Sequence, residues 1–140
     1  MIDIENKIID TVARAVNAQY PNAEVAERFN DSPASFPFVS VEEIDNSNPR
    51  QYQDNTRVEL YSQIFYEVNI CTNDPLKKST AKAIAQIVDE AMNDMKLLRQ
   101  SKVPTPNINR TVYRLTMRYR AIVGKGRQVG DNIVYQMYHQ

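Results

Sequence analysis

Residues 57–72 read Arg-Val-Glu-Leu-Tyr-Ser-Gln-Ile-Phe-Tyr-Glu-Val-Asn-Ile-Cys-Thr, and this stretch indicates the fold class more clearly than any other. Six of its apolar residues share one parity, namely Val58, Leu60, Ile64, Tyr66, Val68 and Ile70. Successive side chains of a strand point to opposite faces of a sheet, so a period of two over this length predicts a strand buried on one side. Cys71 has the other parity and is expected on the more polar face, near the end of the strand.

A helix is expected directly after this strand, from residue 74 to about residue 96. Asp74 is a candidate N-cap, with Pro75 at the first helical position. Apolar residues recur at helical spacing in Ile84, Ile87, Val88, Ala91, Met92 and Met95. We interpret the two methionines as core filling rather than as a binding groove.

The chain beyond this helix predicts two more strands. Residues 97–109 contain Val103-Pro104-Thr105-Pro106-Asn107, which excludes a helix and favours an extended, polyproline-like path. Residues 111–123 alternate, with Tyr113, Leu115, Met117, Tyr119, Ala121 and Val123 on one face. The glycines of residues 124–130 predict a flexible link, whose spacing fits no phosphate-binding loop. Residues 132–138 alternate again and could pair back as a hairpin.

The chain before the central strand predicts one helix and weaker strands. Residues 4–18 carry an apolar stripe of Ile4, Ile8, Ile9, Val12, Ala13 and Val16. Residues 24–30 and 36–44 are strand candidates, and Pro37 belongs at the start of its strand or on an edge. Residues 46–56 are polar and predict a long loop, either a plain connection or a segment that orders against a neighbour.

The predicted order is helix, strands, helix, strands, within 140 residues, a length that fits one domain. Consecutive strands without helical crossovers favour a mostly antiparallel sheet. The apolar stripes of the two helices are then expected to pack on one face of that sheet. The sequence therefore predicts a single α+β domain over residues 1–140.

Composition disfavours several classes of function. The only histidine is His139 and there is one cysteine, so neither an internal disulfide nor a histidine-based zinc site is expected. Glu42-Glu43 and Asp89-Glu90 are adjacent pairs whose side chains diverge, and we interpret them as solvated charges rather than a catalytic pair. No stretch approaches the ~20 apolar residues of a membrane span, and the acidic N-terminus is unlike a signal peptide. We expect no enzyme, no cofactor and no metal.

Charge is unevenly distributed, although the net charge is zero. Residues 1–70 contain 12 acidic and 5 basic residues, whereas residues 71–140 contain 5 acidic and 12 basic residues. Either the two halves interleave and the charges mix, or one face is acidic and another basic. The second arrangement suits head-to-tail association, in which unlike patches meet. A basic face could also contact nucleic acid.

The most informative cluster is a row of arginines, Arg114, Arg118 and Arg120, with Arg110 before them. On a strand, residues of one parity line one face. Either acids of a neighbouring strand or subunit neutralise this row, or it contacts phosphates. The candidate acids are Glu59 and Glu67, with Glu42 and Asp45 as further choices. We take the four arginines with the first two acids as candidates for an interface or for the lining of a lumen.

Several stretches together resemble the tail-terminator and tail-completion proteins of long-tailed phages. They are Phe36-Pro-Phe-Val-Ser-Val-Glu-Glu43, the alanine-rich helix Lys77–Met92, Val103–Asn107, Val112-Tyr113-Arg114 and Met117–Ala121. The resemblance covers roughly residues 2–123 and rests on pattern and order rather than on chemical motifs. The last 17 residues match nothing that we can assign.

The resemblance implies an antiparallel sheet backed by two helices, in subunits that form a homo-oligomeric ring, commonly a hexamer. Such a ring ends the tail tube at its head-proximal end and joins the tail to the head. The implied partners are further copies of the chain, the tail tube protein, a head-completion or neck protein, and DNA passing through the lumen, with no membrane. The implied location is the virion tail, assembled in the host cytoplasm, and no catalytic residues are implied.

An alternative is a small nucleic-acid-binding module that uses the basic C-terminal half. A near-neutral pI of about 6.6 disfavours this as the main role. The tyrosines of the 111–123 strand also lie on the parity opposite to the arginines, whereas stacking partners for single strands are expected on the same face.

Overall fold

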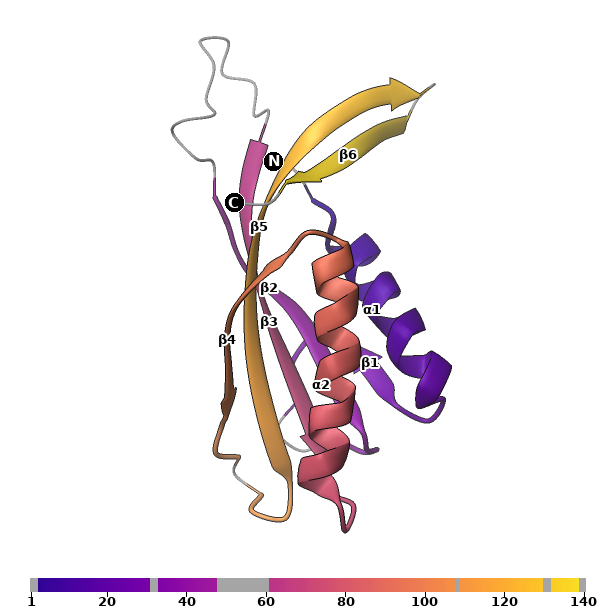
Figure 1. Cartoon of the computed structure of the whole chain (residues 1–140), viewed down its shortest axis with the longest axis vertical. Coiled ribbons are helices and arrows are strands. Elements are labelled where there is room, and N and C mark those ends of the chain that lie inside the picture. Colours follow the sequence, from indigo (N-terminus) through magenta and orange to yellow (C-terminus); the bar gives the residue numbers. More distant parts are fainter. Residues whose placement is uncertain (1–2, 31–32, 48–60, 108, 130–131, 139–140) are drawn as a thin grey trace.

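The computed structural model describes residues 3–30, 33–47, 61–107, 109–129 and 132–138. Within these ranges the chain forms two helices and six strands (Figure 1). In chain order they are α1 (Glu5–Gln19), β1 (Glu24–Ala26), β2 (Phe38–Ser47), β3 (Tyr61–Thr72), α2 (Lys77–Asp94), β4 (Leu98–Pro104), β5 (Tyr113–Val129) and β6 (Asn132–Tyr138).

The strands form one sheet in the order β1-β2-β3-β5-β4, and β6 pairs with the far part of β5. Every strand pair is antiparallel except β1 with β2, which is parallel. β3 lies at the centre and pairs with β5 from Tyr61–Gly124 to Thr72–Tyr113. The predicted α+β class with a mostly antiparallel sheet is therefore confirmed.

Both helices pack on one face of the sheet, as predicted (Figure 1). The buried stripes are Ile8, Val12 and Val16 in α1 and Ala81, Ile84, Ala85, Val88, Ala91 and Met92 in α2. All of these except Ala91 share one core cluster with strand residues of a single parity, such as Val39, Val68 and Leu115. Met92 is fully buried and Met95 packs against the cluster, which confirms that these methionines fill the core.

A second, smaller cluster lies on the other face and changes the predicted setting of Cys71. The cysteine is fully buried between Phe38 and Val112, with Phe29 packed against them. Its parity was predicted correctly, but these apolar neighbours cover it on the otherwise polar face. Burial raises the pKa of the Cys71 thiol to about 11, although the nearby Arg114 acts in the opposite direction.

The Cys71 thiol is therefore expected to be unreactive in the folded protein at neutral pH, because the thiolate is the nucleophile. We expect a disulfide exchange reagent such as dithionitrobenzoate to label native protein at least about a hundredfold more slowly than urea-unfolded protein. Absorbance of the released thiolate gives both rates. Equal rates would place Cys71 at the surface and would contradict the packing of this cluster.

The start of α2 differs from the prediction. The helix begins at Lys77, with Leu76 as an N-cap residue that makes no side-chain cap bond. Asp74 and Pro75 lie in the preceding turn, and the Asp74 carboxylate accepts a hydrogen bond of 2.8 Å from Thr80 Oγ1. The predicted Asp74 N-cap is therefore wrong.

The sequence prediction also missed β4 and shortened β5. Six of the seven β4 residues are exposed and Ser101 is half-buried, so no apolar alternation marks this strand, and only its pairing with β5 defines it. The predicted flexible link of residues 124–130 is likewise wrong, because β5 continues to Val129 against β6. The predicted hairpin strand at 132–138 is confirmed, and Figure 1 shows the hairpin extending past the end of α2.

The chain before β3 holds smaller differences. β1 is shorter than the predicted 24–30 segment, and Asn46 and Ser47 belong to β2 rather than to a loop. The rest of the predicted 46–56 loop and the first residues of the predicted 57–72 strand lie outside the described residues.

Candidate assembly surface

The face of the sheet without helices carries the arginine row. β5 places Arg114, Arg118 and Arg120 on this face because they alternate with the buried residues of the strand. Arg110 is exposed in the turn before β5. Glu59 lies outside the described residues.

Arg118 is paired with Glu67, one of the acids that the sequence suggested. The Arg118 Nε atom lies 3.1 Å from Glu67 Oε2, and the two side chains are 59% and 19% exposed. In register, Glu42 of β2 lies across from Glu67, and Ser101 of β4 lies across from Arg118. An exposed pair of this kind contributes at most about 1 kcal/mol to stability, so the Arg118 guanidinium keeps much of its capacity to bind a partner.

Arg114 is held by two contacts within the chain. Its Nε donates a 2.9 Å hydrogen bond to Asn69 Oδ1, and its guanidinium carbon lies 3.9 Å from the centre of the Phe29 ring. Asn69 Oδ1 also accepts a 2.7 Å bond from Thr116 Oγ1. Arg114 therefore ties the segment around Phe29 to the sheet, a structural role that sequence reasoning did not find.

Arg120 has a different environment. It is half-buried, its strand neighbours in register are Phe65 and Leu98, and its Nε has no hydrogen-bond partner among the described residues. A buried unpaired donor is costly. Of the three arginines of the row, Arg120 would gain the most free energy from a further hydrogen-bond acceptor.

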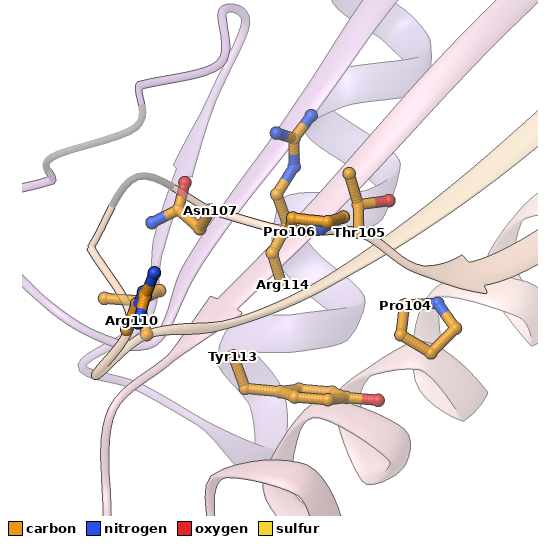
Figure 2. Close-up of a pocket in the computed structure, with 8 residues that line it drawn as sticks. Pro104, Thr105, Pro106, Asn107, Arg110, Tyr113 and Arg114 are labelled. Atoms are coloured by element: carbon orange, nitrogen blue, oxygen red, sulfur yellow. The ribbon is translucent and has the colours of Figure 1, made fainter.

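Arg110 and Arg114 line an open hollow of about 420 Å³ at the end of β4. Its other walls include the Pro104–Asn107 segment and Tyr113. Figure 2 shows the Arg114 guanidinium and the Tyr113 ring projecting to opposite sides of β5. These two side chains therefore do not converge on one point, whereas the polar groups of a small-molecule site do.

The half of the sheet that holds β1 and β2 is acidic. A cleft of about 230 Å³ beside the start of α1 is lined by Glu5, Glu27, Arg28, Glu42 and Glu43. Burial, followed by the charges of Asp3 and Glu27, raises the pKa of Glu5.

Glu43 lies in the same cleft and faces the helices. Burial raises the pKa of Glu43, although its Oε1 accepts a 3.2 Å hydrogen bond from the Tyr66 hydroxyl. The prediction that Glu42 and Glu43 point to opposite faces holds, but Glu43 is half-buried and hydrogen-bonded rather than fully solvated.

The raised carboxyl pKa values predict how stability depends on pH. The folded protein holds the protons of the Glu5 and Glu43 carboxyls more tightly than the unfolded chain, in which the ordinary carboxyl pKa is 4.5. The stability that this proton binding contributes is complete below pH 4.5 and is lost as the pH rises through the raised pKa of the folded protein. Glu43→Gln, which can still accept from Tyr66, is expected to be more stable than wild type at pH 7, by up to about 1 kcal/mol after solvent screening.

Urea unfolding at pH 4.5 and pH 7 measures this difference. The advantage of Glu43→Gln should shrink toward pH 4.5, whereas the exposed Glu90→Gln on α2 should show no such change. An advantage that grows at low pH would contradict the sign of the Glu43 shift.

Asp89 and Glu90 on α2 also separate in environment. Asp89 accepts a 2.8 Å hydrogen bond from the Tyr119 hydroxyl and lies 3.7 Å from Arg99, whereas Glu90 is exposed. Burial, followed by the Asp89 contact, raises the pKa of Tyr119. The predicted solvated pair is therefore wrong for Asp89, which joins α2 to the sheet.

The charges of the sheet are separated by strand. β1, β2 and β3 carry only acidic charged residues, namely Glu24, Glu42, Glu43, Asp45 and Glu67. β4 and β5, up to Gly124, carry only basic ones, namely Arg99, Lys102, Arg114, Arg118 and Arg120. Because the strand order is β1-β2-β3-β5-β4, the sheet has an acidic half and a basic half. The two halves meet at the Arg118–Glu67 pair.

No family model matches the chain, and a search of curated proteins found no match. In the part of the chain that the structure describes, no group of three or more His, Cys, Asp or Glu side chains could hold a metal ion. None of the helices in these ranges is long and apolar enough to cross a membrane.

Proposed function

We propose that this chain is a virion structural protein of a long-tailed phage. In this proposal it forms a ring at the head-proximal end of the tail, ends the tail tube there and joins the tail to the head or neck. The observation that carries the proposal is the separation of charge into two halves of one sheet. A subunit with unlike sides suits the heterologous contacts that close a ring.

The fold agrees with this role. The resemblance to tail-terminator and tail-completion proteins implies an antiparallel sheet backed by two helices, and the chain has that arrangement. The hairpin of β5 and β6 extends beyond the helices, where it is available to a neighbouring subunit (Figure 1).

The experiment that tests the proposal is light scattering on a sizing column followed by negative-stain microscopy. A discrete ring of several 16.1 kDa copies, six in the expected case, supports it. In a phage that encodes this chain, a nonsense mutation in its gene should give tails of uncontrolled length that do not join heads. Normal tails from such a mutant would contradict the proposal.

The second candidate is binding to nucleic acid, because β4 and β5 gather the basic residues of the sheet. It predicts binding to duplex DNA that weakens steeply with salt, and a loss of that binding in the triple variant Arg114→Gln, Arg118→Gln, Arg120→Gln. The buried Tyr66 and Tyr119 lie on the helix side of the sheet, where they cannot stack on bases. This disfavours single strands as the ligand.

A further inference from the structure

The outer edge of β4 differs from the rest of the sheet. β4 pairs with β5 on one side and ends the strand order on the other, so in the part of the chain that the structure describes no strand pairs with its outer side. Leu98 and Val103 are 39% and 49% exposed, so this edge carries apolar surface. Lys102 is also exposed, and Arg99, likewise exposed, lies 3.7 Å from Asp89.

The open face of this edge combines apolar and basic groups, and its helix side adds two further cations. Leu98 and Val103 share the open face with Arg118 and Arg120, because they pair with Arg120 and Thr116 in register. Arg99 and Lys102 have the other parity and lie on the helix side. An exposed edge is either protected by its charges or used for pairing. Exposed apolar residues between cations favour the use of this edge for pairing, with a partner whose surface carries carboxylates.

The acidic half of the same molecule has the matching chemistry. Glu24 and Glu27 are exposed at the β1 end of the sheet, beside the cleft that Glu5, Glu42 and Glu43 line. These acids lie at the opposite end of the strand order from β4. The β1–β2 side of one copy can therefore face the basic β4 edge of the next copy while the two copies keep the same orientation.

We propose that the free edge of β4 is a docking surface for a second copy of this chain, which presents its acidic β1–β2 side to it. The inference deepens the proposed function, on which it rests for the closing of the ring, by naming the two surfaces in contact. The same contact repeats on every copy because each subunit keeps one free acidic and one free basic side. Opposite potentials make association faster and make it sensitive to ionic strength.

Charge reversal on each side tests the contact in the full chain. The basic-side variant is Arg99→Glu with Lys102→Glu, and the acidic-side variant is Glu24→Lys with Glu27→Lys. The single variants Lys102→Glu and Glu27→Lys serve if a double variant fails to fold, since Arg99 contacts Asp89 and Glu24 accepts from Ser35. Lys78→Glu with Lys82→Glu, on the exposed face of α2, is the matched control.

Sedimentation velocity at low ionic strength measures self-association of each protein alone and of the two variants mixed. We expect each side-specific variant to associate at least about tenfold more weakly than wild type, and the control to associate as wild type does. An equal mixture of the two double variants should associate again, because one then carries two acidic sides and the other two basic sides.

The outcomes separate this contact from the ring itself. Rings that persist in both side-specific variants would overturn the docking surface and leave the proposed ring intact. A wild-type chain without rings, together with pairing in the mixture, would support the surface and count against the ring. A mixture that stays apart overturns the inference, and a basic-side variant that loses only duplex DNA binding would assign the edge to DNA instead.

Discussion

Replacing Asn69 with alanine is expected to reduce the free energy of unfolding by about 2–4 kcal/mol, because several polar partners lose their bonds at once. Asn69 is 1% exposed. Its Oδ1 accepts from Arg114 Nε at 2.9 Å and from Thr116 Oγ1 at 2.7 Å, and its Nδ2 donates to Glu67 Oε1 at 3.1 Å. Alanine leaves a charged donor and a buried hydroxyl without this acceptor.

Urea unfolding followed by circular dichroism measures the loss. Asn17→Ala, at an exposed position of α1, is the control for the same change of side chain and should alter stability by less than about 0.5 kcal/mol. A loss below about 1 kcal/mol for Asn69→Ala would show that water replaces the amide. The position of the arginine row would then depend less on Asn69 than its bonds indicate.

Asn69 also shows which features of the candidate site the sequence could predict and which it could not. Asn69 has the parity of Cys71 and Glu67, and the same rule of alternation predicted the arginine row of the next strand. A period of two tells which face a side chain takes, but not what covers that face. Phe29 and Phe38 come from elsewhere in the sequence and cover Cys71 on this face. Asn69 is 1% exposed and is hydrogen-bonded to Arg114 and Thr116 there.

The fold was predictable where a strand or helix buries one side. β3, β5 and the two helices have regular apolar periods because each presents one face to the same core. β4 has no such period, since it lies at the edge and its residues are mostly exposed. Its place is determined by hydrogen bonds to β5, a long-range pairing that local composition does not encode.

The charge separation was predictable in part. The sequence showed an acidic first half and a basic second half but could not decide whether they mix in the fold. The strand order decides it, because β3 joins the acidic strands to β5 and leaves β4 as the outer basic strand. A crossover that placed β4 beside β2 would have mixed the same residues. The proposed docking contact therefore rests on the strand order, and charge counting alone could not have indicated it.

Replacing Ile84 with alanine is the second change for which we expect a large effect, a loss of about 2–5 kcal/mol in the free energy of unfolding. Ile84 is fully buried between α2 and the sheet, whereas Ile87 on the same helix is only partly buried and packs at the margin of the same core cluster. Ile87→Ala is therefore a matched control, in which helix propensity changes equally and only burial differs. We expect Ile87→Ala to cost at most about half as much, because less buried volume is removed.

Comparing the two variants by thermal and urea unfolding removes the propensity contribution, so the difference reports how tightly α2 is packed on β3 and β5. This packing supports the proposed assembly as well, because the arginine row lies on the other face of the same strands. A destabilised core at Ile84 should weaken self-association only when the protein unfolds, whereas charge reversal at β4 should weaken it in a fully folded protein. Equal losses for Ile84→Ala and Ile87→Ala would contradict the helix orientation on which both faces of the sheet are assigned.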